Sequence, residues 1–94
     1  MAFDLRFLPE GDEDMRRLEA DPTLERVVRA AHQTLGRLEL DPGDRRLRTR
    51  QFQTPEFGHV RMTWVGLGEW RVFWQTTDVP NELLVRRVVE TPAT

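Results

Sequence analysis

The sequence contains no cysteine, no tyrosine and no lysine among its 94 residues. The lack of cysteine excludes disulfide bonds and thiolate metal sites, and it is compatible with a reducing compartment. No stretch approaches the roughly 18 consecutive apolar residues that a membrane-spanning helix needs. The segment from Met1 to Glu10 lacks a basic region followed by an apolar stretch, so we expect no secretory signal and a cytoplasmic location.

The composition is typical of a folded soluble domain. Apolar residues make up 38% and charged residues 32%, which is too apolar for a disordered chain and too charged for a membrane protein. At this length we expect a single domain spanning residues 1–94. All 14 basic residues are arginine. A genomic base composition that favours arginine codons is the preferred explanation of this bias, and the alternative is that arginine suits bidentate binding of phosphate.

The charge is divided unevenly along the chain, although the net charge is only −2. Residues 1–44 contain 6 arginines and 11 acidic residues, a balance of −5, whereas residues 45–94 contain 8 arginines and 5 acidic residues, a balance of +3. The sequence therefore predicts an acidic first half joined to a basic second half. Ordinary fluctuation over a short chain is the alternative explanation.

The first half follows a strand–helix–helix pattern. Alternating apolar residues predict a short strand at 3–7, and the acidic stretch from Glu10 to Glu19 predicts a short helix. Asp21-Pro22 is a typical helix start, and residues 24–38 then repeat apolar side chains at helical spacing. The residues 41–44 form a turn that ends this helix.

After the turn the apolar period changes to two, which predicts strands near 46–50, 59–64, 70–75 and 83–89. Short turns connect these strands, so we expect them to pair in an antiparallel manner. The predicted fold is α+β with the order β-α-α-β-β-β-β. In this fold two N-terminal helices pack on a C-terminal antiparallel sheet.

The tryptophans offer a candidate for the sheet face that the helices cover. Trp64, Trp70 and Trp74 alternate with polar residues and share their pattern with Val60, Met62 and Val72. We interpret this apolar face as the core, with a set of base-stacking platforms as the alternative.

The opposite sheet face is then predicted to be basic. It would collect the following side chains: His59, Arg61, Arg71, Arg86, and in continuation Arg46, Arg48 and Arg50. Such a face is suited to binding a phosphodiester backbone. The alternative is an ordinary solvated face, on which arginine stems cover apolar surface.

His59 is the one histidine in this set, and histidine is the residue type most often used in proton transfer, so it is a candidate general acid or base beside Arg61. Glu69 is a candidate for the second proton-transfer group. An ordinary surface histidine is the alternative interpretation of His59. The two histidines stand on different predicted elements, so we predict no metal site, and no motif indicates a cofactor.

Three stretches of the second half carry a recognisable pattern: Gly58-His59-Val60-Arg61-Met62, Gly68-Glu69-Trp70-Arg71-Val72-Phe73-Trp74, and Leu84-Val85-Arg86. The pattern resembles the sheet of RelE/ParE-type toxins, in which an arginine-bearing hairpin precedes a hydrophobic last strand. The N-terminal strand, the helix pair and the helix exit at Leu40-Asp41-Pro42 fit this family as well.

The resemblance implies roles for particular residues. Arg71 matches the arginine that assists phosphoryl chemistry in the RelE branch, and Arg61 matches the other arginine of the hairpin. The sequence differs after its last strand, where Glu90-Thr91-Pro92 stands in place of the Arg with Tyr or His that RelE-type nucleases bear. The computed pI of about 5.7 is also low for a ribosome-directed toxin.

Two functions remain open at this point. The first is a RelE-like toxin that acts as an mRNA endonuclease with an altered site, in which Arg61 and Arg71 would stabilise the charge while His59 or Glu69 moved protons. The second is a non-catalytic protein-interaction module on the same scaffold. The family implies a cognate antitoxin as partner, and mRNA on the ribosome or another enzyme such as DNA gyrase as the target.

Overall fold

A computed structural model describes residues 2–92. Its elements, in chain order, are β1 (Asp4–Phe7), α1 (Pro9–Ala20), the 3₁₀ turn η1 (Pro22–Leu24), α2 (Glu25–Leu40), β2 (Thr49–Thr54), β3 (Gly58–Val65), β4 (Trp70–Thr76) and β5 (Glu82–Glu90). The predicted order of one strand, two helices and four strands is confirmed. No helix within residues 2–92 has the length and apolar character needed to cross a membrane.

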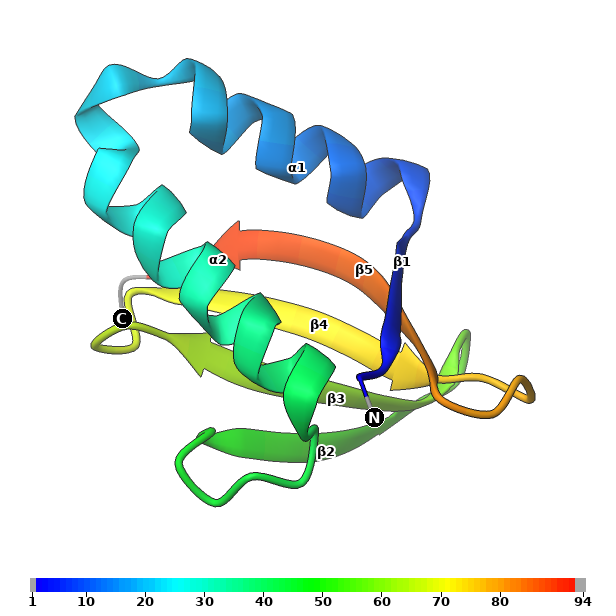
Figure 1. Cartoon of the computed structure of the whole chain (residues 1–94). Coiled ribbons are helices and arrows are strands. Elements are labelled where there is room, and N and C mark those ends of the chain that lie inside the picture. Colours follow the sequence, from blue (N-terminus) through cyan, green and yellow to red (C-terminus); the bar gives the residue numbers. More distant parts are fainter. Residues whose placement is uncertain (1, 93–94) are drawn as a thin grey trace.

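The five strands form one sheet in the order β1-β5-β4-β3-β2. The strands β2 to β5 pair antiparallel, as their short connections predict, but β1 pairs parallel to β5. Both helices intervene between β1 and β5 in the chain, and a long connection of this kind allows parallel pairing. The helices lie together on one side of the sheet (Figure 1). The predicted α+β class is therefore confirmed, with a mixed rather than purely antiparallel sheet.

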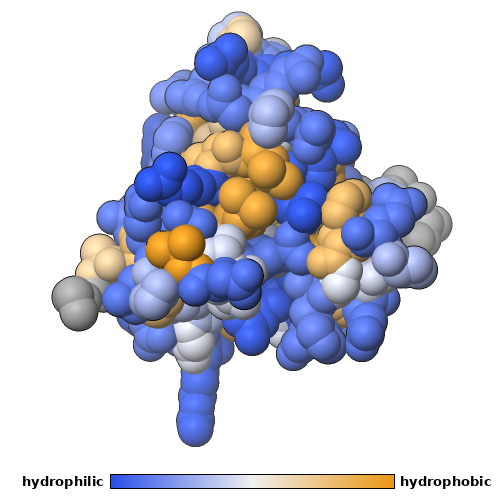
Figure 2. Space-filling view, turned by 90° about the vertical axis from the view of Figure 1, so that its right-hand side faces the viewer, coloured by the Kyte–Doolittle hydropathy of each residue, from blue (hydrophilic) through white to orange (hydrophobic). Residues whose placement is uncertain are grey.

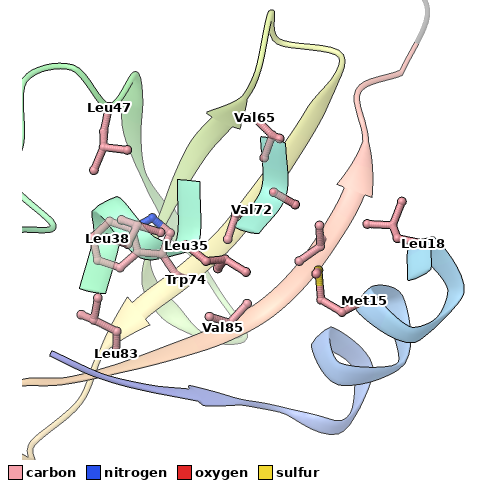
Figure 3. Packing of buried hydrophobic residues seen from close by; sticks show 12 residues of the cluster. Met15, Leu18, Leu35, Leu38, Leu47, Val65, Val72, Trp74, Leu83 and Val85 are labelled. Atoms are coloured by element: carbon pink, nitrogen blue, oxygen red, sulfur yellow. The ribbon is translucent and has the colours of Figure 1, made fainter. Parts of the chain in front are cut away.

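The core lies between the helices and the sheet (Figure 3). Met15 and Leu18 of α1 and Leu35 and Leu38 of α2 are buried there, as the helical spacing of α2 predicts. Trp74 of β4 is only 1% exposed. Its indole Nε1 donates a hydrogen bond of 2.9 Å to the hydroxyl of buried Thr63, so the one polar atom of the ring is satisfied.

The helix boundaries follow from local hydrogen bonds. The Asp21 carboxylate accepts from the backbone N–H of Thr23 at 2.9 Å, which confirms the predicted helix start. The first turn after Pro22 is 3₁₀, so α2 itself begins at Glu25. At the other end, Asp41 follows Leu40 and accepts from the N–H of Gly43 at 3.0 Å, which forms the turn that ends α2.

The strand predicted at 46–50 is displaced. Asp44 accepts hydrogen bonds from both the backbone and the side chain of Arg46, and the N–H of Leu47 donates to the Asp44 carbonyl at 3.0 Å. These bonds hold Arg46 in a turn rather than in the sheet. The ladder begins at Thr49 and continues to Thr54.

Candidate nucleic-acid interface

The pairing register divides the sheet side chains between two faces. Directly opposed residues of antiparallel strands place their side chains on the same face. Thr63 pairs with Val72, and Arg61 pairs with Trp74, so these residues lie on the face that the helices cover. We call the other side the open face. It carries Arg50 and Phe52 of β2, Val60, Met62 and Trp64 of β3, Arg71, Phe73 and Gln75 of β4, and Arg86 of β5.

This arrangement corrects the predicted basic face. Arg61 lies opposite Trp74 on the helix-covered side, and His59 shares that side because it stands two residues before Arg61. Arg71 lies on the open face opposite Trp64. The grouping of His59, Arg61 and Arg71 on one face was wrong, because the β3–β4 turn sets a register in which Trp64 and Trp74 point to opposite sides.

The candidate proton-transfer groups are also apart. Glu69 lies in the turn between β3 and β4, where its backbone carbonyl accepts from the N–H of Thr91 at 2.8 Å. His59 lies at the opposite end of β3. The six residue steps from His59 to Val65 correspond to about 20 Å of extended strand. Glu69 stands two residues before Arg71, but it lines a hollow beside α2 together with Val27 and Trp70, so neither group belongs to the open face.

At the β2 side of the open face, two arginines lie against one tryptophan. The guanidinium carbon of Arg50 is 5.2 Å from the ring centroid of Trp64, and that of Arg48 is 5.9 Å from it. Arg48 Nη2 also donates to the carbonyl of Gly66 at 3.0 Å. These contacts fix both positive charges close to the same ring.

Arg71 occupies the neighbouring position on β4. Its guanidinium carbon is 5.0 Å from the Phe73 ring centroid. Its Nε is buried and has no hydrogen-bond partner, and no other buried side-chain nitrogen or oxygen within residues 2–92 is left in this way. A buried donor without an acceptor is uncommon in native proteins, and this sets Arg71 apart from the other arginines of the open face.

Arg86 of β5 is held in place by a chain of hydrogen bonds that runs through Gln75. Its Nε donates to Gln75 Oε1, while Gln75 Nε2 donates to the carbonyls of Phe57 at 2.6 Å and His59 at 2.9 Å. The Arg86 guanidinium carbon lies 4.0 Å from the Phe57 ring centroid. These contacts fix the side chain, and its two Nη groups have no hydrogen-bond partner within residues 2–92.

The charges of the open face are not neutralised by acidic side chains. Within residues 2–92, no carboxylate lies within 4.0 Å of the guanidinium groups of Arg48, Arg50, Arg71 or Arg86. Arg46 behaves differently. It forms a salt bridge of 2.8 Å with Asp44, and hydrogen bonds from Arg46 lower the pKa of Asp44 to about 2. Arg46 therefore belongs to a paired turn and not to the open face.

The open face has an apolar floor although no helix covers it. Met62 is 3% exposed and lies between Arg50 and Phe73 in the pairing register, and Val60 is 5% exposed and lies opposite Phe52. Phe52 and Phe57, at the β2 side and in the β2–β3 turn, are exposed. The surface thus combines free arginines with accessible aromatic rings, which is the combination that binds single-stranded nucleic acids.

Sequence reasoning did not single out Phe52, Phe57 and Gln75. The alternation of Gln51, Phe52 and Gln53 has the period of two that is typical of a strand. It would have predicted that the strand continues to Thr54 and includes Phe52. The role of Gln75 depends on a contact with Arg86 across the sheet, which no local pattern contains. Within residues 2–92, no cluster of three or more histidine, aspartate or glutamate side chains is arranged to hold a metal ion.

The sequence matches no protein-family model and no curated protein. Two solved structures are similar to it in fold. A chain of the toxin–antitoxin complex RelBE2 from Mycobacterium tuberculosis is 17% identical, with a TM-score of 0.67, over 97% of this chain and 100% of that one. A chain of the archaeal RelE–RelB complex from Pyrococcus horikoshii OT3 is 12% identical, with a TM-score of 0.67, over 96% of each chain. The chain therefore has the fold of RelE-type toxins, as its sequence pattern predicted.

Proposed function

We propose that the protein is a RelE-like toxin whose open face binds the phosphodiester backbone of single-stranded RNA. The observation that carries this proposal is the set of arginines on the open face, Arg48, Arg50, Arg71 and Arg86, none of which has a carboxylate within 4.0 Å among residues 2–92. A phosphate oxygen is the acceptor that an arginine without a carboxylate partner prefers, because it offers both hydrogen-bond acceptors and the opposite charge.

The surroundings of Arg71 support a chain of phosphates rather than a single anion. Arg48 and Arg50 lie on the β2 side of Arg71, next to Trp64. Arg86 lies on the opposite side of Arg71, on β5. Trp64 and Phe73 lie between these charges. A flexible single strand can place successive phosphates on the arginines while its bases meet aromatic rings.

The same proposal includes an antitoxin as partner, since both similar structures are toxin–antitoxin complexes. A hollow of about 450 Å³ between β1 and the helices suits such a partner. Phe7 and Leu35 contribute apolar lining, while Asp12, Glu19 and Glu39 contribute negative charge. A segment of the antitoxin with apolar and basic side chains is complementary to this hollow.

Cleavage of the bound RNA is a second candidate, because Arg71 and Arg86 could stabilise the charge that develops when a 2′-hydroxyl attacks its phosphate. The proton carriers suggested by the sequence, His59 and Glu69, lie away from these arginines. Mapping transcript 5′ ends after expression in a susceptible bacterium separates the candidates. New ends that disappear in Arg71→Ala would establish cleavage, and growth inhibition without new ends would favour binding alone.

Binding itself is tested by the salt dependence of the affinity for a uridine decamer. Each phosphate contact on a single strand contributes about −0.7 to the slope of log K against log salt, so four arginine contacts predict a slope of about −3. A slope near zero, or no measurable binding at low salt, would refute the proposal. Co-expression with neighbouring genes tests the antitoxin: the wild type should co-purify with a small protein, and Glu39→Arg should reduce its recovery.

A further inference from the structure

A hollow of about 750 Å³ adjoins the arginines of the open face. It lies between the start of α1, the β2–β3 turn and the middle of the sheet, and its lining includes Leu8, Glu10, Phe57, Val60, Phe73 and Arg86. This end of the molecule has apolar surface gathered in its middle and bordered by hydrophilic side chains (Figure 2). The volume is within the range of pockets that hold a nucleotide-sized ligand.

The apolar part of the lining suits a flat aromatic ligand. Phe57 and Phe73 contribute two rings, and Val60 lies between them on β3. The stacking of a base on an aromatic side chain stabilises binding without selecting one base over another, because every base has a π-face. Selection must therefore come from the polar groups at the edge of the hollow.

Two polar groups in the lining remain free to select a base. Arg86 donates from its Nε to Gln75, and its two Nη groups make no hydrogen bond to a side chain or backbone group within residues 2–92. Glu10 has no salt bridge within residues 2–92. Arg87 also lines the hollow, but its Nε and Nη2 donate to the carboxylate of Asp14. The hollow thus offers a fork of donors on Arg86 and a pair of acceptors on Glu10.

We propose that this hollow binds a guanine base of the RNA strand held by the open face. Guanine presents two acceptors, O6 and N7, which match a bidentate arginine. It also presents two donors, N1–H and the exocyclic N2 amino group, which match a carboxylate. Adenine would bring a donor, its N6 amino group, towards the arginine, and neither pyrimidine carries both pairs of groups.

This inference rests on the proposed function and deepens it, because Phe73 lies in the wall of the hollow and beneath the guanidinium group of Arg71. A strand whose phosphate binds Arg71 can therefore place an adjacent base against Phe73. The backbone contacts would supply affinity, while Glu10 and Arg86 would supply preference for one base.

The test is calorimetric titration with 5′-GMP and 5′-AMP, and with two decamers, one of uridine alone and one with a single central guanosine. We expect GMP, and the guanosine-containing decamer, to bind about tenfold more tightly than their comparison ligands, since a factor of about ten lies within the range over which one good bidentate contact discriminates. Glu10→Gln and Arg86→Lys should each abolish the preference. Glu13→Gln is the matched control, because Glu13 is an exposed acid of the same helix that pairs with Arg17.

The outcomes separate this inference from the proposed function. If both decamers bind equally and with the expected salt slope, the guanine pocket is refuted while backbone binding stands. If neither decamer binds, the proposed function fails, and the mononucleotide titration still decides the pocket: a preference for GMP that Glu10→Gln removes supports it, and equal or absent binding refutes it. Circular dichroism of each variant confirms that the fold is intact.

Discussion

Asp14 of α1 and Arg87 of β5 are joined by two hydrogen bonds, from Nε at 2.7 Å and from Nη2 at 3.1 Å. The same carboxylate accepts from the backbone N–H of Val88 at 2.9 Å. The register of β4 and β5 shifts at this point, which leaves Arg86 as the extra residue of a bulge. The carboxylate of Asp14 thus accepts hydrogen bonds from β5 at the point where the β4–β5 ladder is interrupted. Arg86, the extra residue of the bulge, lies on the open face.

Asp14→Asn should lower the free energy of unfolding by about 1–3 kcal/mol, because the amide cannot accept all three hydrogen bonds and leaves a buried donor unsatisfied. Chemical denaturation measures this difference. Asp12→Asn is the control, since Asp12 forms an exposed ion pair with Arg16 on the same helix and should change stability by less than about 0.5 kcal/mol. Equal losses in the two variants would contradict the structural role of Asp14.

Gly11→Ala should destabilise the protein, by about 1–3 kcal/mol as for other overpacked sites. A Cβ at this position would lie 2.8 Å from the carbonyl oxygen of Val85, so α1 would have to move away from β5. Gly36→Ala is the matched control on α2, where a Cβ meets no atom within 4 Å. That change should stabilise the helix by up to about 1 kcal/mol. A melting temperature that is higher for Gly11→Ala than for Gly36→Ala would refute the close packing of α1 against β5.

Leu35→Ala should lower the free energy of unfolding by about 2–5 kcal/mol, because it truncates a buried side chain and leaves a cavity between α2 and the sheet. Leu40 lies at the end of the same helix and is 72% exposed, so Leu40→Ala is the control and should have little effect. A loss below about 0.5 kcal/mol for Leu35→Ala would fall within the range of surface substitutions and would mean that the apolar stripe of α2 is not in the core.

The arrangement of helices and strands could be predicted from the sequence because it depends on local signals. The helical spacing that ends at Leu38 and the period-two alternation around Val72 each report a buried face within a few residues. The pairing of β1 with β5 depends on contacts between opposite ends of the chain. No local pattern states whether such a distant strand joins parallel or antiparallel.

The candidate site was predicted less completely than the fold. Arg48, Arg50, Arg71 and Arg86 lie on the open face, as their membership of one basic face predicted, but Arg61 does not. Alternation within one strand shows which of its side chains share a face. Which face of the next strand they share depends on the pairing register, and the turn between the strands sets that register. The bulge beside Arg86 adds a further shift that the apolar run of β5 does not reveal.

The Asp44–Arg46 turn makes stability depend on pH in the acidic range. The folded-state pKa of Asp44 is lowered from 3.8 to about 2 by hydrogen bonds from Arg46, so the contribution of this turn is fully present above about pH 4 and is lost as the pH falls towards 2. The difference in stability between wild type and Asp44→Asn should follow the same course in denaturation curves measured across this range. A difference that stays constant down to pH 2 would exclude Asp44 as its origin.

A comparison of Arg50→Ala with Arg61→Ala shows whether RNA binds the open face of the sheet. Each arginine lies over a tryptophan at nearly the same distance, 5.2 Å to Trp64 for Arg50 and 5.3 Å to Trp74 for Arg61, but on opposite faces of the sheet. The two variants therefore lose the same charge and a similar ring contact. The account predicts that Arg50→Ala weakens decamer binding and makes the salt slope shallower by about 0.7, while Arg61→Ala leaves both unchanged. Equal losses in the two variants, or a loss confined to Arg61→Ala, would contradict it.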